Sequence, residues 1–213
     1  MLASNILKIN DSIILNWLGH ASFKLKAGER IIYFDPWKVK KGESADLILI
    51  THSHFDHLSP DDVRHVQKKD TVIVTTKDSA SNLKGDVRTI KPGDKITVGD
   101  IEIQAIPAYN IGKSYHPKVN GWVGFIVTIS GKRIYHAGDT DAIPEMKKLS
   151  VDIALLPVGG TYTMTAEEAA EIANEFKPVS AIPMHWGTIV GSKADAERFK
   201  KLFKGETNIL QPE

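Results

Sequence analysis

The chain has 213 residues, of which 42% are hydrophobic and 25% are charged, a composition typical of a globular protein with a substantial core. With 27 basic and 26 acidic side chains the formal net charge is +1, so the charge balance does not favour nucleic acid or an anionic membrane as a partner. The sequence contains no cysteine, which excludes disulfides and thiolate metal ligands. Any metal ion must therefore be bound by imidazole and carboxylate groups.

Residues 1–10 carry no long apolar run after a basic segment, so they do not resemble a secretion signal. Nowhere does an apolar stretch approach the length of about 18 residues that a membrane-spanning helix requires. We therefore expect a cytoplasmic protein without a membrane span. The sequence leaves the oligomeric state open.

Strands are predicted over the first third of the chain, where β-branched and aromatic residues are frequent. The expected strands cover residues 13–18, 22–26 and 30–34. Two polar side chains, His20 and Asp35, stand at strand ends. We expect Asp35 to accept a hydrogen bond from a metal-binding imidazole, since such imidazoles usually need a partner of this kind. A strand-end hydrogen bond without function is the competing explanation for both residues.

Residues 51–59, Thr-His-Ser-His-Phe-Asp-His-Leu-Ser, place three histidines and an aspartate within six positions, directly after an apolar run that predicts a buried strand. If the backbone stays extended, His52, His54 and Asp56 point the same way while His57 points across. Without a cation, this grouping would waste hydrogen-bonding capacity and invite charge repulsion. We therefore predict a metal site rather than an ordinary polar loop, with room for two ions.

The middle of the chain is predicted to alternate short helices and strands. Ser59 followed by Pro60 and two acidic residues predicts a helix start, and His65 on this helix is expected to be a surface residue. Beyond it we expect a strand at 71–75, a short helix near 79–83, and strands at 87–90, 95–98 and 101–106.

Residues 107–120 show no clear periodicity and combine aromatic, amide, basic and imidazole groups. This mixture is typical of a substrate-facing loop on a sheet scaffold. We take Tyr109, Asn110, Lys113 and Tyr162 as candidate substrate contacts, with a structural or surface role as the alternative for each.

In the second half of the chain, an apolar strand runs into Gly138-Asp139. Glycine lets the backbone approach metal ions closely, and a carboxylate with two oxygens can span two ions, although a turn aspartate is the competing interpretation. Thr165 and Glu168 predict a capping box. The expected elements are a hairpin of 122–129 and 133–136, a strand at 151–157, a helix at 166–176, a strand at 180–184, a helix at 193–203 and a strand at 208–210.

The motif His-x-His-x-Asp-His after an apolar strand resembles the signature of the metallo-β-lactamase superfamily of binuclear metal-dependent hydrolases. Further motifs follow in the order expected for that family, so the resemblance covers nearly the whole chain. It implies an α/β (α+β) fold, a four-layer αββα sandwich, formed by a single domain over residues 1–213.

Residues 135–141 and 157–164 are similar to the lactonase-like branch of this superfamily, which includes L-ascorbate-6-phosphate lactonase. The element Tyr109-Asn110 departs from the pattern of that branch, which leaves the lactone substrate open.

Carried over residue by residue, the resemblance implies a complete set of metal ligands. It assigns His52, His54 and His116 to the first ion, Asp56, His57 and His185 to the second, and Asp139 as the bridge between them. His20 and Asp35 are expected beside these ligands as their supports.

The resemblance also implies two divalent metal ions, with zinc as the first choice and manganese or iron as alternatives. A metal-bridged hydroxide would attack a carbonyl or phosphoryl centre, oriented by Asp56, while His136 supports the site or transfers a proton. Two ions, two carboxylates and one hydroxide sum to about +1, which favours an anionic substrate. We therefore expect hydrolysis of a small anionic ester, lactone or phosphoester. The alternatives are a phosphodiesterase or nuclease-type activity, and a non-catalytic metal-binding or sensing protein.

Overall fold

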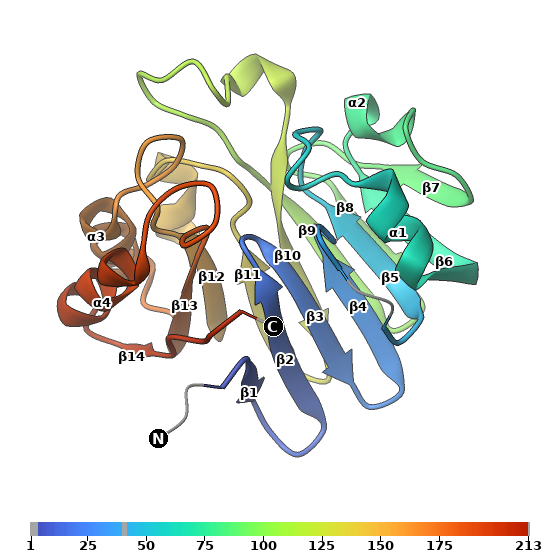
Figure 1. The fold of residues 1–213 in the computed structure, drawn as a ribbon, viewed down its shortest axis with the longest axis horizontal. Helices are drawn as coiled ribbons and strands as arrows, with labels where there is room; N and C mark the ends of the chain where they lie inside the picture. The colour runs from blue at the N-terminus through green and yellow to red at the C-terminus, as the bar shows by residue number, and fades with distance from the viewer. Residues whose placement is uncertain (1–3, 40–41, 213) are drawn as a thin grey trace. The chain divides into compact units, whose positions relative to one another are not determined.

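The computed structural model describes residues 4–39 and 42–212. The segment 1–10 is not expected to be a secretion signal, and its first three residues, 1–3, lie outside the described residues. The chain divides into two compact units, unit 1 comprising Met1–Lys91 with Leu210–Glu213, and unit 2 comprising Pro92–Ile209. Each unit is built on one seven-stranded sheet (Figure 1). Within the described ranges, no helix is long and apolar enough to cross a membrane.

The sheet of unit 1 keeps its strands in chain order from one edge to the other. The strands are β1 (Ile6–Lys8), β2 (Ile13–Gly19), β3 (Ser22–Ala27), β4 (Arg30–Phe34), β5 (Ala45–Ile50), β6 (Gln67–Thr75) and β7 (Asp86–Thr89). β1 to β4 pair antiparallel, whereas β4 to β7 pair parallel. Parallel neighbours need a crossover, and α1 (Pro60–Val66) and α2 (Lys77–Ala80) lie in the two that follow β5 and β6.

Helix α1 is held on this sheet by apolar contacts. Val63 and Val66 of the helix belong to one buried cluster with Ile48, Ile50 and Ile73 of β5 and β6. Burying each of these side chains contributes about 1.5–3 kcal/mol. This packing fixes the point at which the segment between β5 and α1 must end.

The sheet of unit 2 repeats the same plan. Its strands are β8 (Lys95–Val98), β9 (Ile101–Pro107), β10 (Val123–Ile129), β11 (Lys132–His136), β12 (Ile153–Pro157), β13 (Ser180–Met184) and β14 (Glu206–Thr207). β8 to β11 pair antiparallel and β11 to β14 pair parallel. The helical segments are η1 (Lys118–Asn120), η2 (Pro144–Lys148), α3 (Ala166–Phe176) and α4 (Lys193–Leu202).

Helices α3 and α4 lie side by side in unit 2 (Figure 1). The capping box predicted at the start of α3 is confirmed, because the Glu168 backbone N–H donates to Thr165 Oγ1 and the Thr165 N–H donates to the Glu168 carboxylate. The buried face of α3 contains the apolar residues Ala169, Ile172, Ala173 and Phe176.

The observed elements differ from the predicted ones in several places, and β6 begins at Gln67 rather than at residue 71. Strand β1 (Ile6–Lys8) was not predicted, because three residues are too few to show a period. The short helix expected near 79–83 is α2, which starts earlier, where the Thr76 hydroxyl meets Ser79 Oγ at 2.9 Å. The last strand is β14 at Glu206–Thr207 rather than 208–210, because β14 takes its register from residues 180 and 181 of β13.

Candidate functional site

In unit 1 the predicted site residues gather at one edge of the sheet. β2, β4 and β5 run in the same direction, since β3 is antiparallel to both β2 and β4, and β5 is parallel to β4. The residues that follow these strands therefore emerge at the same edge. We call the set that emerges there the unit 1 cluster: His20, Asp35, His52, His54, Asp56 and His57.

The segment that carries the histidines is not extended. The expectation that His52, His54 and Asp56 point the same way required an extended backbone, so it does not apply. The backbone N–H groups of His57 and Leu58 both donate to the His54 carbonyl oxygen, at 3.0 and 2.8 Å. These bonds close a turn in the segment. The N-cap predicted at Ser59 is confirmed, because its side chain accepts from the backbone N–H of Asp62.

Asp35 is the central acceptor of the unit 1 cluster. Its Oδ1 accepts from the Thr51 backbone N–H at 2.8 Å, and its Oδ2 accepts from the Thr51 hydroxyl at 2.7 Å. Oδ2 also accepts from His57 Nδ1 at 2.6 Å. Because a carboxylate only accepts, the His57 proton must lie on Nδ1, which leaves the lone pair on Nε2. The hydrogen bond that Asp35 was predicted to accept from a histidine of the motif is therefore present.

Thr51 places the ring proton of His52 on Nδ1 in the same way. Its hydroxyl donates its one proton to Asp35, so the oxygen accepts from His52 Nδ1, 2.9 Å away. The lone pair of His52 then lies on Nε2, which is 3.1 Å from Nδ1 of His54. The role of Thr51 was not predicted from the sequence. Its position between the buried strand and the histidine motif was the signal that could have identified it.

His20 contacts the carboxylate of the motif. Its Nε2 lies 3.0 Å from Asp56 Oδ2, and ligand atoms of His20, Asp56 and His57 lie within 4.8 Å of one another. The backbone of His20 is left-handed, with φ of 52°, and that of Asp35 likewise has φ of 42°. Non-glycine residues in this region are strained, and such strain gathers at functional sites.

An aromatic pair lies next to this cluster and was missed from the sequence. The ring of Trp37 is 5.3 Å from the ring of His20, and it meets the ring of Phe55 edge-on at 6.2 Å. Phe55 is 70% exposed although it stands between His54 and Asp56 in the motif. The available signal was a large apolar residue inside an otherwise polar loop.

In unit 2 the predicted residues also follow strands that run in one direction. β9 and β11 are both antiparallel to β10, and β13 has the direction of β11 through β12. His116 lies in the loop after β9, Asp139 follows β11, and His185 follows β13. Figure 1 shows the loop between β9 and β10 extending past the ends of these strands.

The three predicted ligands of unit 2 converge on one oxygen atom. Asp139 Oδ2 lies 3.2 Å from Nε2 of His116 and 3.2 Å from Nε2 of His185. All three side chains are buried. We call them the unit 2 cluster. Two imidazole nitrogens and a carboxylate at this spacing form a donor set suited to a divalent transition metal.

His185 has a left-handed backbone with φ of 59°. Gly159 packs directly beneath it, since a Cβ built on Gly159 would overlap the His185 carbonyl oxygen. The residue after His185, Trp186, donates from its ring to the Pro183 carbonyl oxygen at 2.9 Å. The end of β13 is therefore fixed on both sides of the histidine.

His136 is fully buried at the end of β11, and its Nδ1 accepts from the Gly138 backbone N–H at 3.2 Å. This bond shapes the turn that leads to Asp139. The role in proton transfer proposed for His136 stays a prediction.

The side chains taken as substrate contacts have protein partners in unit 2. The Tyr109 hydroxyl donates to Glu145 Oε2 at 2.9 Å, and Lys113 Nζ donates to Asp141 Oδ1 at 2.7 Å and to the Thr163 carbonyl oxygen at 2.8 Å. The Asn110 amide bonds to protein groups through both its oxygen and its nitrogen. The fourth candidate, Tyr162, packs its ring against the ring of Tyr115, with the ring centroids 4.8 Å apart. Among the described residues, it is the candidate whose side chain is not held by a hydrogen bond.

Lys118 adds a second anchor to this loop. Its ammonium group donates to the Tyr109 hydroxyl at 3.1 Å and to Glu145 Oε1 at 3.0 Å. These two hydrogen bonds raise the pKa of Lys118, and the bond to the Tyr109 hydroxyl has the larger effect. Burial raises the pKa of Glu145, but hydrogen bonds from its own backbone, Lys118 and Tyr109 outweigh burial and hold that pKa below its ordinary value.

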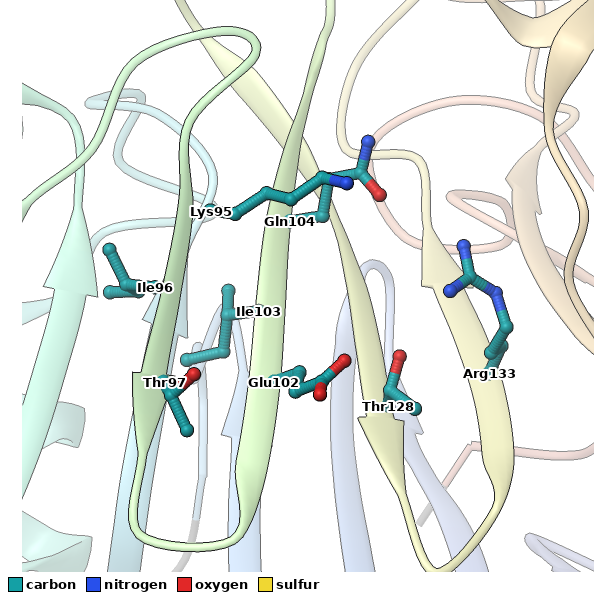
Figure 2. A pocket seen from close by; sticks show the side chains of 8 residues that line it. All are labelled: Lys95, Ile96, Thr97, Glu102, Ile103, Gln104, Thr128 and Arg133. Atoms are coloured by element: carbon teal, nitrogen blue, oxygen red, sulfur yellow. The ribbon is translucent and has the colours of Figure 1, made fainter.

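An open depression of about 280 Å³ lies elsewhere on unit 2, over β8 to β11 (Figure 2). Its lining includes two cross-strand pairs, Thr97 opposite Glu102 and Thr128 opposite Arg133. These polar side chains alternate with apolar ones such as Ile103, which is buried. The depression is the solvent-facing pleat of an antiparallel sheet, and it contains none of the residues named above as site candidates.

Known proteins are similar to this chain over nearly its whole length. A family model described as "Beta-lactamase superfamily domain" matches residues 14–185. Proteins named "UPF0173 metal-dependent hydrolase" from Thermococcus onnurineus and Pyrococcus furiosus are each 36% identical, and each alignment covers 93% of this chain and 96% of the relative. A crystal structure from Parabacteroides distasonis has a TM-score of 0.82 and 37% identity, covering 93% of this chain and 94% of that one.

Proposed function

The chain belongs to the metallo-β-lactamase superfamily, and from this premise we propose that it is a hydrolase that uses two divalent metal ions. The proposed ligand set is the one that the sequence motifs imply. It consists of His52, His54 and His116 for one ion, Asp56, His57 and His185 for the other, and Asp139 shared between them.

One observation carries this proposal: His116 Nε2 and His185 Nε2 each lie 3.2 Å from the same oxygen of Asp139. In the proposed set these histidines serve different ions, so an aspartate in contact with both suits the shared ligand. The donor chemistry supports the same conclusion, because imidazole and carboxylate groups suit zinc, manganese and iron.

The protein's own part is to hold each nitrogen ready to bind. Asp35 keeps the His57 proton on Nδ1, and Thr51 does the same for His52. Asp56, anchored by His20, would present its carboxylate toward the reacting water. Divalent ions bound here would supply an activated water and polarise the electrophilic oxygen of a substrate.

For the substrate we propose a small anionic ester, lactone or phosphoester, in a cytoplasmic setting. The support is the net positive charge of about +1 expected for the loaded centre, together with the lactonase-like sequence of residues 157–164. Phosphodiesterase or nuclease-type activity at the same centre is the second candidate. A non-catalytic metal-binding or sensing protein is the third.

The decisive experiment compares wild type with Asp139→Ala and with Asp70→Ala, a control that removes an exposed carboxylate from β6. Elemental analysis measures bound metal, and turnover is measured on bis-p-nitrophenyl phosphate and on a phosphorylated lactone. We expect near two equivalents of metal in wild type and in the control, with loss of metal and of turnover in Asp139→Ala. The better substrate then separates lactonase from phosphodiesterase.

Wild-type protein that stays folded, binds no metal and turns over neither substrate would overturn the proposal. Bound metal without turnover on any ester, lactone or phosphodiester would support the non-catalytic alternative.

A further inference from the structure

We propose that Asn110 is a positioning residue, whose side-chain amide fixes the tautomer and the place of His116. The inference rests on the proposed function, in which His116 binds metal. It gives Asn110 a different role from the substrate contact expected from the sequence.

The amide oxygen of Asn110 faces His116 through two bonds. Oδ1 accepts from the His116 backbone N–H at 2.9 Å and lies 3.0 Å from His116 Nδ1. A third bond, from the Asn110 backbone N–H to the His116 carbonyl oxygen at 2.8 Å, closes the loop between the two residues. Both residues are buried, with exposed fractions of 8% for Asn110 and 1% for His116.

The amide nitrogen of Asn110 faces acceptors only. Nδ2 donates to Asp141 Oδ1 at 3.1 Å and to the Tyr162 carbonyl oxygen at 2.9 Å. Turning the amide over would set its oxygen against both acceptors and its N–H groups against the His116 backbone N–H. The orientation of the amide is therefore fixed by its surroundings rather than by the histidine ring.

This orientation determines the tautomer of His116. Because Asn110 Oδ1 can only accept, the ring proton must lie on Nδ1, and the lone pair then lies on Nε2. Nε2 is the nitrogen that lies 3.2 Å from Asp139 Oδ2. A neutral imidazole binds metal through its unprotonated nitrogen, so the amide keeps the required nitrogen free of a proton.

Asp141 holds the amide in turn. Its Oδ2 accepts from the Ile111 backbone N–H at 2.7 Å, and its Oδ1 accepts from Lys113 Nζ at 2.7 Å. The loop between Pro107 and η1 has no regular secondary structure, so Asn110 and Asp141 supply contacts that strands supply elsewhere. Asp141 was missed from the sequence, where it stands two positions after Asp139.

Two variants test the proposal. Asn110→Leu keeps the approximate size of the side chain and removes both the acceptor and the donors. The double variant Asn110→Asp with Asp141→Asn exchanges the two groups, which keeps the net charge, an acceptor facing His116, and a donor–acceptor pair between the two positions. Asn120→Ala removes an exposed amide at the end of η1 and is the matched control.

The measurements are the ¹⁵N chemical shifts of the His116 ring in metal-free protein, which report the tautomer directly, and a zinc titration. We expect the Nδ1–H tautomer in wild type and in Asn120→Ala. In Asn110→Leu we expect a mixed tautomer and zinc affinity at the His116 site about 10–100-fold weaker. The exchange variant is expected to restore the wild-type tautomer and most of the affinity.

Asn110→Leu that folds with wild-type ring shifts and affinity would overturn the proposal. Should Asn110→Leu not fold, Asn110→Ala decides in its place, because it removes the same acceptor oxygen with a smaller side chain. A mixed His116 tautomer in folded Asn110→Ala would support the proposal, and a single Nδ1–H tautomer would overturn it. Absence of zinc binding in wild type, with a tautomer that still depends on Asn110, would reject the proposed function and leave the positioning role standing.

Discussion

Asp35 Oδ2 lies 2.6 Å from Nδ1 of His57, and both side chains are fully buried in unit 1. The same carboxylate accepts from the backbone and hydroxyl of Thr51. Asp35, directly after β4, therefore holds both Thr51, the first residue of the histidine segment, and His57, its last histidine. Hydrogen bonds to a charged group contribute about 1.5–3 kcal/mol each, so this contact is a main support of the segment.

Replacing this carboxylate tests its effect on metal binding. Asp35→Asn retains one acceptor oxygen but can no longer accept on both sides, so we expect zinc affinity to fall about 10–100-fold. The free energy of unfolding should fall by about 1–3 kcal/mol. Zinc titration and urea unfolding measure the two effects.

Asp70→Asn, at an exposed position on β6, is the control and should match wild type in both measurements. Unchanged zinc affinity in folded Asp35→Asn would show that Asp35 supports the fold alone.

Gly159→Ala is expected to displace the backbone of His185. The added Cβ would overlap the His185 carbonyl oxygen and press on Val190, so the backbone at the end of β13 must shift. We expect zinc affinity to fall at least about tenfold, as for loss of a ligand's support. Isothermal titration of the variant with zinc measures this.

Gly131→Ala is the matched control for that variant. It lies in the turn between β10 and β11 with φ of 71° and nothing within 4 Å of the added Cβ, so it costs about 1 kcal/mol of stability through backbone strain without contacting a ligand. Equal loss of zinc affinity in both variants would attribute the effect to general destabilisation.

Metal should stabilise the protein through mass action. At a free zinc concentration about 100 times the dissociation constant, the free energy of unfolding should rise by about 2.7 kcal/mol over chelator-treated protein. Urea unfolding with zinc and with chelator measures the difference. In Asp139→Ala the rise should be much smaller, and an equal rise there would place the binding elsewhere.

The contact of Glu145 with Lys118 and Tyr109 predicts a pH dependence of stability. The folded-state pKa of Glu145 is held below the ordinary value of 4.5, so its contribution is present above about pH 4.5 and is lost as the pH falls through the folded pKa. Because the side chain is 37% exposed, we expect Glu145→Gln to cost less than about 1 kcal/mol at pH 7.

Urea midpoints of wild type and Glu145→Gln between pH 3 and pH 7, values chosen to span roughly the carboxylate range, check this. The two curves should converge at the acid end, and a constant gap at all pH values would contradict an ionic contribution.

Much of the fold could be predicted from the sequence, because local rules agree with the final structure. The predicted fold class is confirmed, and Ser59 and Thr165 cap helices as expected. Strand ends also carry the predicted site residues, since apolar runs followed by polar groups mark the edge of a sheet.

The rest depended on contacts between residues distant in sequence. The bonds of Asn110 to Asp141 and Tyr162 decide which way its amide faces, and nothing local to the loop shows this. The turn at His54 likewise overrides the period-of-two pattern expected for the motif. The prediction of a single domain and the assignment of individual metal ligands stay predictions.

The way in which each cluster is assembled has a consequence for the order of folding. His52 to His57 are nearly consecutive, and their segment is closed by bonds between neighbours in the chain. His116, Asp139 and His185 meet only after the strands from β9 to β13 have paired. Because contacts local in sequence form faster than distant ones, we expect backbone amides around the histidine segment to gain protection early in refolding. Capacity to capture a metal through unit 2 should then appear late, with completion of its sheet.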